Sequence, residues 1–147
     1  MASKREETMR QAFALLLLSL NLGLPPAARA ETQTPCNLGT LKGRYVFTGR
    51  GFIEAVQPGI PRVHYGFFEF DGEGKLTGRQ SSSRGGKIGR ENLKGIYTVG
   101  ADCSGTITLG GIVGSETHWD FYLTEDQKRG HMIRMDEGNM AVRSFEK

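Results

Sequence analysis

Several features that define other protein classes are absent from this 147-residue chain. Its 21 glycines follow no Gly-X-Y period, which excludes a collagen-like helix. They are also too many for a helical bundle, because each glycine inside a helix costs about 1 kcal/mol. Hydrophobic residues make up 37% and charged residues 24%, which suits a soluble globular protein rather than a disordered one. The composition therefore favours β-structure.

The chain also lacks the short motifs typical of common catalytic and metal sites. It has no Gly-x-Ser-x-Gly elbow and no His-Glu-x-x-His sequence. His64, His118 and His131 lack the close spacing of a zinc motif, and we expect them on the surface or at the rim of the fold. Gly110-Gly111-x-x-Gly114-Ser115 lies between expected strands rather than before a helix, so it does not fit a phosphate loop. We therefore predict no metal ion and no cofactor, and the catalytic residues, if any, stay unknown.

The beginning of the chain has the pattern of an export signal. Three basic residues precede an apolar run from Ala12 to Leu24, which is too short to span a bilayer comfortably. Ala28-Arg29-Ala30 then supplies the small-x-small pattern that signal peptidase accepts. We predict a signal peptide over residues 1–30 and a single mature domain over residues 31–147. The mature protein should be periplasmic or extracellular, with no membrane insertion after cleavage.

The chain has almost no excess of positive over negative charge once this leader is removed. The leader carries four basic and two acidic residues, so the 19 basic and 16 acidic residues of the chain fall to 15 and 14. A net charge of about +1 argues against nucleic acid as a partner, because such binding needs concentrated positive charge. The one local basic cluster lies among serines and glycines between Arg79 and Arg90, where we expect a solvated loop.

Two cysteines remain in the mature chain, Cys36 and Cys103. Neither belongs to a Cys-x-x-Cys motif, and an even pair in an exported protein is typical of a structural disulfide. Such a bridge would close a loop of 67 residues, which stabilises the fold by about 4 kcal/mol in the chain-entropy model. We therefore predict one disulfide, between Cys36 and Cys103.

Short stretches of β-favouring residues, separated by turn residues, recur along the whole mature chain. The turn segments, such as Asp71-Gly72-Glu73-Gly74, are too short for helical crossovers, so sequential strands should pair antiparallel. Eight antiparallel strands close most naturally into an up-and-down barrel, which leaves no exposed edge. The predicted strands are Lys42–Ala55, Arg62–Phe70, Lys75–Ser82, Leu93–Val99, Gly105–Ile112, Thr117–Leu123, Gly130–Met135 and Met140–Phe145.

Side chains alternate along a strand, so the pattern also predicts which residues point inward. Trp119, Phe121 and Leu123 share one face of their strand and should belong to the core. A Leu-Lys-Gly-x-Tyr pattern occurs twice, 52 residues apart, and it places Tyr45 and Tyr97 at matched inward positions. Tyr45, Tyr97 and Trp119 are our candidate ligand-binding residues, because aromatic rings with one polar atom suit a flat or lipophilic molecule. Ordinary core packing is the alternative for the same three residues.

Three motifs spread over most of the mature chain resemble a known group of proteins. They are Cys36-x-x-x-x-Leu41-Lys42-Gly43-x-Tyr45-x-Phe47, Phe68-x-Phe70-Asp71-Gly72-x-Gly74, and Tyr97-x-Val99 followed by Asp102-Cys103-Ser104-Gly105-Thr106. The group consists of small exported bacterial proteins of unknown function, similar in build to the eight-stranded, calycin-like barrels of the allene oxide cyclase and dirigent type. These motifs are turn and core residues, so the resemblance implies a fold and carries over no catalytic residue.

Three functional hypotheses follow for an all-β antiparallel barrel with one disulfide. The first is a binding protein that holds a small apolar or aromatic ligand inside the barrel, without catalysis. The second is an isomerase or cyclase acting on such a ligand, as the resemblance could imply. The third is an inhibitor-like module that binds a protein through its loops and has a solid interior. A cavity in the barrel would separate the first two from the third, and the oligomeric state stays open.

Overall fold

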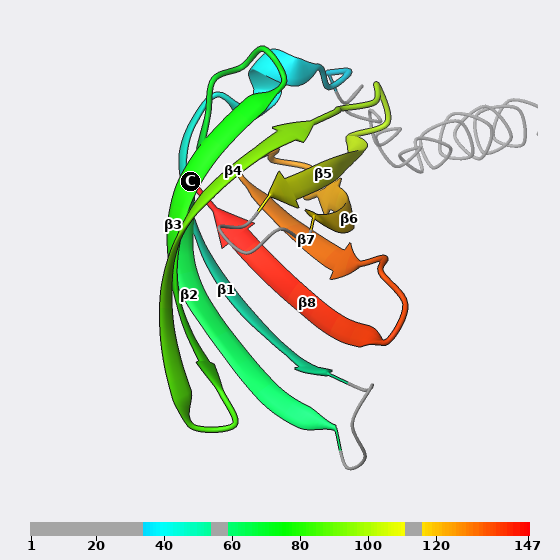
Figure 1. Ribbon diagram of the computed structural model, residues 1–147. Helices are drawn as coiled ribbons and strands as arrows, with labels where there is room; N and C mark the ends of the chain where they lie inside the picture. The colour runs from blue at the N-terminus through cyan, green and yellow to red at the C-terminus, as the bar shows by residue number, and fades with distance from the viewer. Residues whose placement is uncertain (1–33, 54–58, 111–115) are drawn as a thin grey trace, which may run out of the picture. The chain divides into compact units, whose positions relative to one another are not determined.

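A computed structural model describes residues 34–53, 59–110 and 116–147, and these residues form an eight-stranded antiparallel barrel (Figure 1). The predicted signal peptide and the Gly111–Ser115 part of the glycine motif lie outside the described residues. One short 3-10 helix, η1, precedes the strands. The elements are η1 (Leu38–Leu41), β1 (Gly43–Ile53), β2 (Ile60–Phe70), β3 (Lys75–Arg84), β4 (Lys87–Tyr97), β5 (Ser104–Gly110), β6 (Glu116–Leu123), β7 (Arg129–Arg134) and β8 (Asn139–Glu146).

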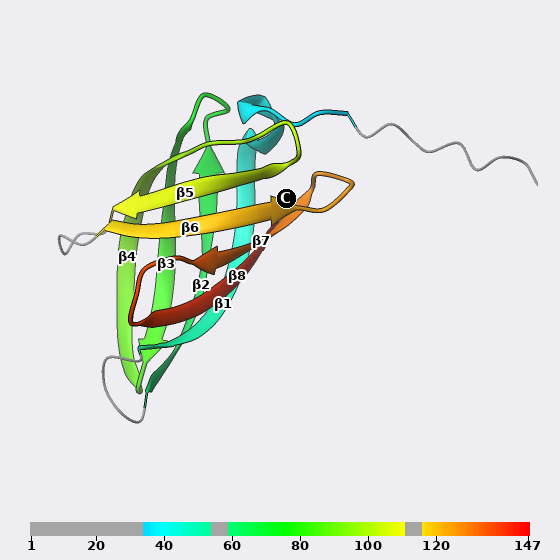
Figure 2. The same cartoon turned by 90° about the vertical axis from the view of Figure 1, so that its right-hand side faces the viewer.

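The strands follow one another around the barrel in sequence order, and β8 closes it by pairing with β1. Figure 2 shows β1 to β4 as long strands beside the shorter β5 to β8. The predicted all-β, up-and-down architecture is therefore confirmed. Within the described ranges, no helix is long and apolar enough to cross a bilayer.

One stretch of the sequence differs clearly from our expectation. We predicted a solvated loop around the basic cluster between Arg79 and Arg90, but β3 and β4 run through it as a long hairpin. Gly85 and Gly86 form its two-residue turn, with φ of 53° and 84°. Positive φ at both central residues matches the twist of the flanking strands, so the strands stay paired up to the turn. The polar side chains misled the prediction because many of them face solvent on both sides of this hairpin.

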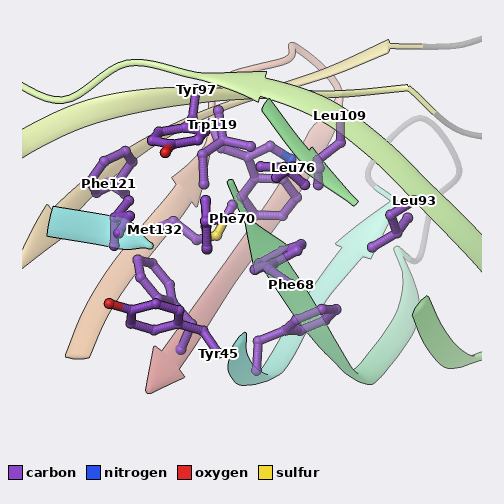
Figure 3. Packing of buried hydrophobic residues seen from close by; sticks show 14 of the residues in the cluster. Tyr45, Phe68, Phe70, Leu76, Leu93, Tyr97, Leu109, Trp119, Phe121 and Met132 are labelled. Carbon is purple, nitrogen blue, oxygen red and sulfur yellow. The ribbon is translucent and has the colours of Figure 1, made fainter. Parts of the chain in front are cut away.

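One end of the barrel is filled by apolar side chains (Figure 3). Trp119 and Phe121 are almost completely buried, and Leu123 packs against the same cluster, so their predicted inward face is confirmed. Aromatic rings meet edge to face here, as between Phe70 and Tyr97, whose centroids are 5.0 Å apart. This cluster provides the main hydrophobic stabilisation of the barrel.

The helix η1 lies at this filled end (Figure 1), a feature the sequence analysis missed. Asn37 caps η1 by accepting a hydrogen bond from the Gly39 amide, and Leu41 is fully buried in the core cluster. The predicted disulfide is confirmed: Cys36, just before η1, is bonded to Cys103 in the β4–β5 connection. The bridge holds the segment that covers this end of the barrel.

Candidate functional site

The opposite end of the barrel contains a cavity of about 470 Å³. It lies where β1, β3, β5 and β7 end and β2, β6 and β8 begin. Its size is within the range of ordinary small-molecule sites. The lining residues are Ile53, Arg62, His64, Gln80, Arg84, Glu91, Leu93, Leu109, Gly110, Thr117, Trp119, Arg134, Asn139 and Arg143.

The polar lining arises from the same alternation that builds the core. On β2, Phe68 and Phe70 point into the barrel, and the same face continues to His64 and Arg62. On β8, Phe145 is inward, and two residues earlier Arg143 is inward as well. Each strand therefore contributes apolar residues to the filled end and polar residues to the cavity.

Arg143 is the most enclosed cation of the cavity, with 5% of its surface exposed. Its guanidinium carbon lies 4.8 Å from the ring centroid of Phe47 and 4.5 Å from that of Trp119, so two aromatic rings contact the charge. Its Nη2 donates a hydrogen bond of 3.1 Å to Oε1 of Gln80. Nε and Nη1 are buried and have no partner among the described residues. Burial, followed by the charges of Arg62 and Arg134, lowers the pKa of Arg143.

Three further arginines line the cavity, and they differ in whether an acidic partner or solvent stabilises their positive charge. Arg134 donates from Nε to Asp136 Oδ2 at 2.7 Å, so a carboxylate balances its charge. Arg62 is 6% exposed, and its Nε has no hydrogen-bond partner within the described part of the chain. Arg84 is exposed at the end of β3, next to the turn of the hairpin. Burial is the main cause that lowers the pKa of Arg62, followed by the charges of Arg134 and Arg84.

The only acidic side chain lining the cavity, among the residues described, is Glu91. It accepts a hydrogen bond of 2.7 Å from Nε2 of Gln80, the same amide whose oxygen binds Arg143. The Gln80 side chain therefore connects the carboxylate of Glu91 to the buried guanidinium of Arg143 by hydrogen bonds. The cavity as a whole is electropositive.

His64 lies inside the cavity wall with 3% of its surface exposed, which contradicts our expectation of a surface or rim position. Its two ring nitrogens are buried and make no hydrogen bond with any described residue. Burial and the charges of Arg143 and Arg62 lower the pKa of His64 to about 3. The imidazole is therefore neutral at physiological pH. The inward register of β2 explains the position, since His64 is four residues from Phe68.

The structure separates the three candidate ligand-binding residues. Trp119 lines the cavity, and its indole nitrogen donates to Thr117 Oγ1 at 2.9 Å. Tyr45 and Tyr97 lie in the filled end (Figure 3), and their hydroxyls donate to the backbone oxygens of Thr40 and Leu38 in η1. The two tyrosines of the repeated pattern therefore share a role in holding η1. Burial raises the pKa of both hydroxyls.

The sequence analysis did not single out Arg62 or Arg143, and it expected His64 on the surface or at the rim. The alternation of inward positions on β2 and β8 was the signal that could have found them. We applied it to apolar residues, such as those around Trp119 and Phe121, and assigned no inward polar residue on β2 or β8. Following the same face for two residues from Phe145, and for four and six residues from Phe68, would have placed all three side chains inside the barrel.

Comparison with known proteins adds no assignment to this geometry. The chain matches no protein-family model, no curated protein and no solved structure. Across the described ranges, no three histidine, cysteine, aspartate or glutamate side chains are grouped so that they could hold a metal ion. The cavity chemistry therefore has to be interpreted from its own residues.

Proposed function

We propose that this protein is an exported binding protein that takes a small molecule with an apolar body into the open end of its barrel. The observation that carries the proposal is the cavity, whose wall combines apolar residues such as Trp119 and Leu109 with inward polar groups. Small-molecule sites typically have this combination, in which apolar surface provides affinity and a few polar groups fix orientation. An inhibitor-like module with a solid interior would have no use for such a cavity.

Two features support export. The first residues have the signal-peptide pattern, with Ala28-Arg29-Ala30 before the expected cleavage point. The disulfide between Cys36 and Cys103 is consistent with an oxidising compartment such as the periplasm. The proposed ligand would therefore be met outside the cytoplasm.

An isomerase or cyclase acting inside the barrel is the second candidate. The observation that favours it is His64, a buried titratable group in the cavity wall. A general base is most effective when its pKa lies near the working pH. Because the pKa of His64 is about 3, the side chain is a weak base there, and binding without catalysis is the better-supported function.

A ligand screen with a blocked cavity tests the proposal. The full chain would be expressed with its leader and recovered in oxidised form, and a panel of small aromatic and aliphatic molecules would be screened by thermal shift. A ligand that binds only the native state raises the apparent melting temperature. Thr117→Trp should abolish these shifts, because Thr117 lines the cavity and the larger ring would fill part of it. The matched variant Thr77→Trp adds the same ring on the outer face of β3 and should retain them.

The outcomes separate the hypotheses. Shifts lost in Thr117→Trp but retained in Thr77→Trp would support binding inside the barrel. A broad panel that gives no shift would contradict the proposal and favour a protein partner. Chemical conversion of a bound ligand, detected by mass spectrometry, would favour the second candidate.

A further inference from the structure

We propose that the ligand of this cavity is an organic oxyanion, whose acidic group is bound by Arg143 and Arg62. The inference rests on the proposed function and names the chemical class of its ligand. Carboxylate, sulfonate and phosphate groups share the chemistry that matters here, namely negative oxygen atoms that accept hydrogen bonds from guanidinium groups.

The first argument is the charge of the wall. Four arginines line the cavity, and one acidic side chain, Glu91, joins them among the described residues. Asp136 balances Arg134 from beside the cavity. No described carboxylate lies within ion-pair distance of Arg143 or Arg62. Buried charges are normally paired, so two buried arginines without a carboxylate partner among the described residues point to a negatively charged ligand.

The second argument is the set of unused donors. The buried Nε and Nη1 of Arg143 and the buried Nε of Arg62 have no acceptor among the described residues. In folded proteins nearly all buried polar atoms are hydrogen-bonded, so such a group of donors in one wall requires an explanation. An oxyanion supplies several acceptor oxygens at once, as arginine–carboxylate and arginine–phosphate contacts do.

The third argument is that the position of Arg143 is held by its surroundings. Phe47 and Trp119 contact its guanidinium group, and Gln80 accepts from its Nη2. On the neighbouring strand, a Cβ at Gly49 would lie 2.6 Å from Cγ of Arg143, so glycine leaves the space that the arginine stem fills. The guanidinium is therefore preorganised, which lowers the conformational entropy that this side chain loses when a ligand binds.

Neutral His64 completes the recognition of an acidic group. Its ring lies in the same wall, and one of its two buried nitrogens carries a hydrogen at neutral pH. A neutral imidazole can donate that hydrogen to an oxyanion without adding a further charge to the arginine cluster. Leu93, Leu109 and Ile53 supply apolar surface for the rest of the molecule.

A naphthalene series tests the inference, because one ring system can carry different groups. Binding of naphthalene carboxylate, naphthalene sulfonate and naphthyl phosphate would be compared with binding of neutral naphthamide to the full, oxidised chain by calorimetry. We expect at least one acid to bind tenfold or more tightly than the amide. Arg143→Met should remove that advantage, so that the acids and the amide bind with similar affinity. Arg79→Met removes a positive charge from the outer face of β3, and it should change neither the affinity for the acids nor the affinity for the amide.

Each outcome decides between the two proposals. Equal binding of acids and amide would overturn the oxyanion inference and leave the binding function in place. Absence of binding by every member of the series, together with an empty thermal-shift screen, would overturn both. If Arg143→Met does not fold, as judged by circular dichroism, Arg62→Met takes its place with the same expected loss. Acid binding that survives in a folded variant of either arginine would also overturn the inference.

Discussion

Individual inward side chains of the barrel serve two opposite purposes, depending on where they lie. Phe121 is completely buried and stabilises the fold, whereas Arg143 is almost as buried but has two donors without a partner in the described part of the chain. A buried charge without a partner lowers the free energy of unfolding, because the folded state has lost its hydration. Such a residue is best explained by what it binds, since the same position could hold an aliphatic side chain at lower cost.

His64 should make the stability of the protein depend on pH. Its pKa is about 3 in the folded protein, compared with about 6.5 in an unfolded chain, so the unfolded state binds more protons between these values. The free energy of unfolding should therefore decrease as the pH falls from about 6.5, by about 1 kcal/mol per pH unit from this group alone. Urea denaturation at several pH values measures the slope, and His64→Gln should make it shallower.

A second histidine provides the control for this prediction. His131 is exposed on β7, and its Nδ1 contacts Ser144 Oγ on the outer face of the barrel. His131→Gln makes the same chemical change on the outer face of the barrel, away from the cavity. Aspartates with lowered pKa values, such as Asp136, contribute to acid destabilisation equally in both variants. An identical slope in the wild type and His64→Gln would contradict the buried, neutral state of His64.

Among the elements, the β3–β4 hairpin depends most directly on its turn. Gly86 has φ of 84°, and no atom lies within 4 Å of the position that a Cβ would occupy there. The expected cost of Gly86→Ala, about 1 kcal/mol, therefore comes from the backbone conformation alone. Gly86→Asn should cost less, because asparagine tolerates positive φ better than alanine does. Urea denaturation of the two variants measures the difference.

Gly110 offers a matched control at the end of β5. Its φ is not in the left-handed region, and a Cβ there would meet only a backbone oxygen at 3.7 Å, an ordinary contact distance. Gly110→Ala should therefore be close to neutral. If Gly86→Ala were equally neutral, the turn conformation described for the hairpin would be wrong.

The strands were the most predictable elements, and the reason is physical. Alternation of apolar residues identified the inward face around Trp119 and Phe121, because a half-buried strand separates apolar from polar side chains. The same criterion failed where inward residues are charged, at Arg62 and His64, since polarity there reflects the cavity rather than solvent. It failed again at Lys87, where β4 begins, because a two-stranded hairpin with polar side chains on both faces has no apolar period.

At the scale of the whole molecule, the barrel has two ends with different properties. One end is filled by aromatic residues, covered by η1 and held by the disulfide between Cys36 and Cys103. The other end carries the electropositive cavity. Composition could not predict this difference, because basic and acidic residues nearly balance over residues 31–147, while four arginines gather around the cavity at one end. The apolar contacts of the filled end stabilise the fold, whereas the buried arginines of the cavity end, Arg62 and Arg143, lower its stability.

This division predicts that the disulfide can be removed without loss of the site. The double variant Cys36→Ser, Cys103→Ser should lose about 2 to 4 kcal/mol of unfolding free energy, because the loop of 67 residues is no longer closed in the unfolded chain. Hydrogen exchange should increase first in η1, whose segment the bridge holds. At temperatures where the double variant is folded, it should bind naphthalene acids with wild-type affinity. Arg143 and Arg62 lie at the cavity end of the barrel, away from the disulfide. A loss of affinity in the folded double variant, measured by calorimetry, would show that the two ends are coupled.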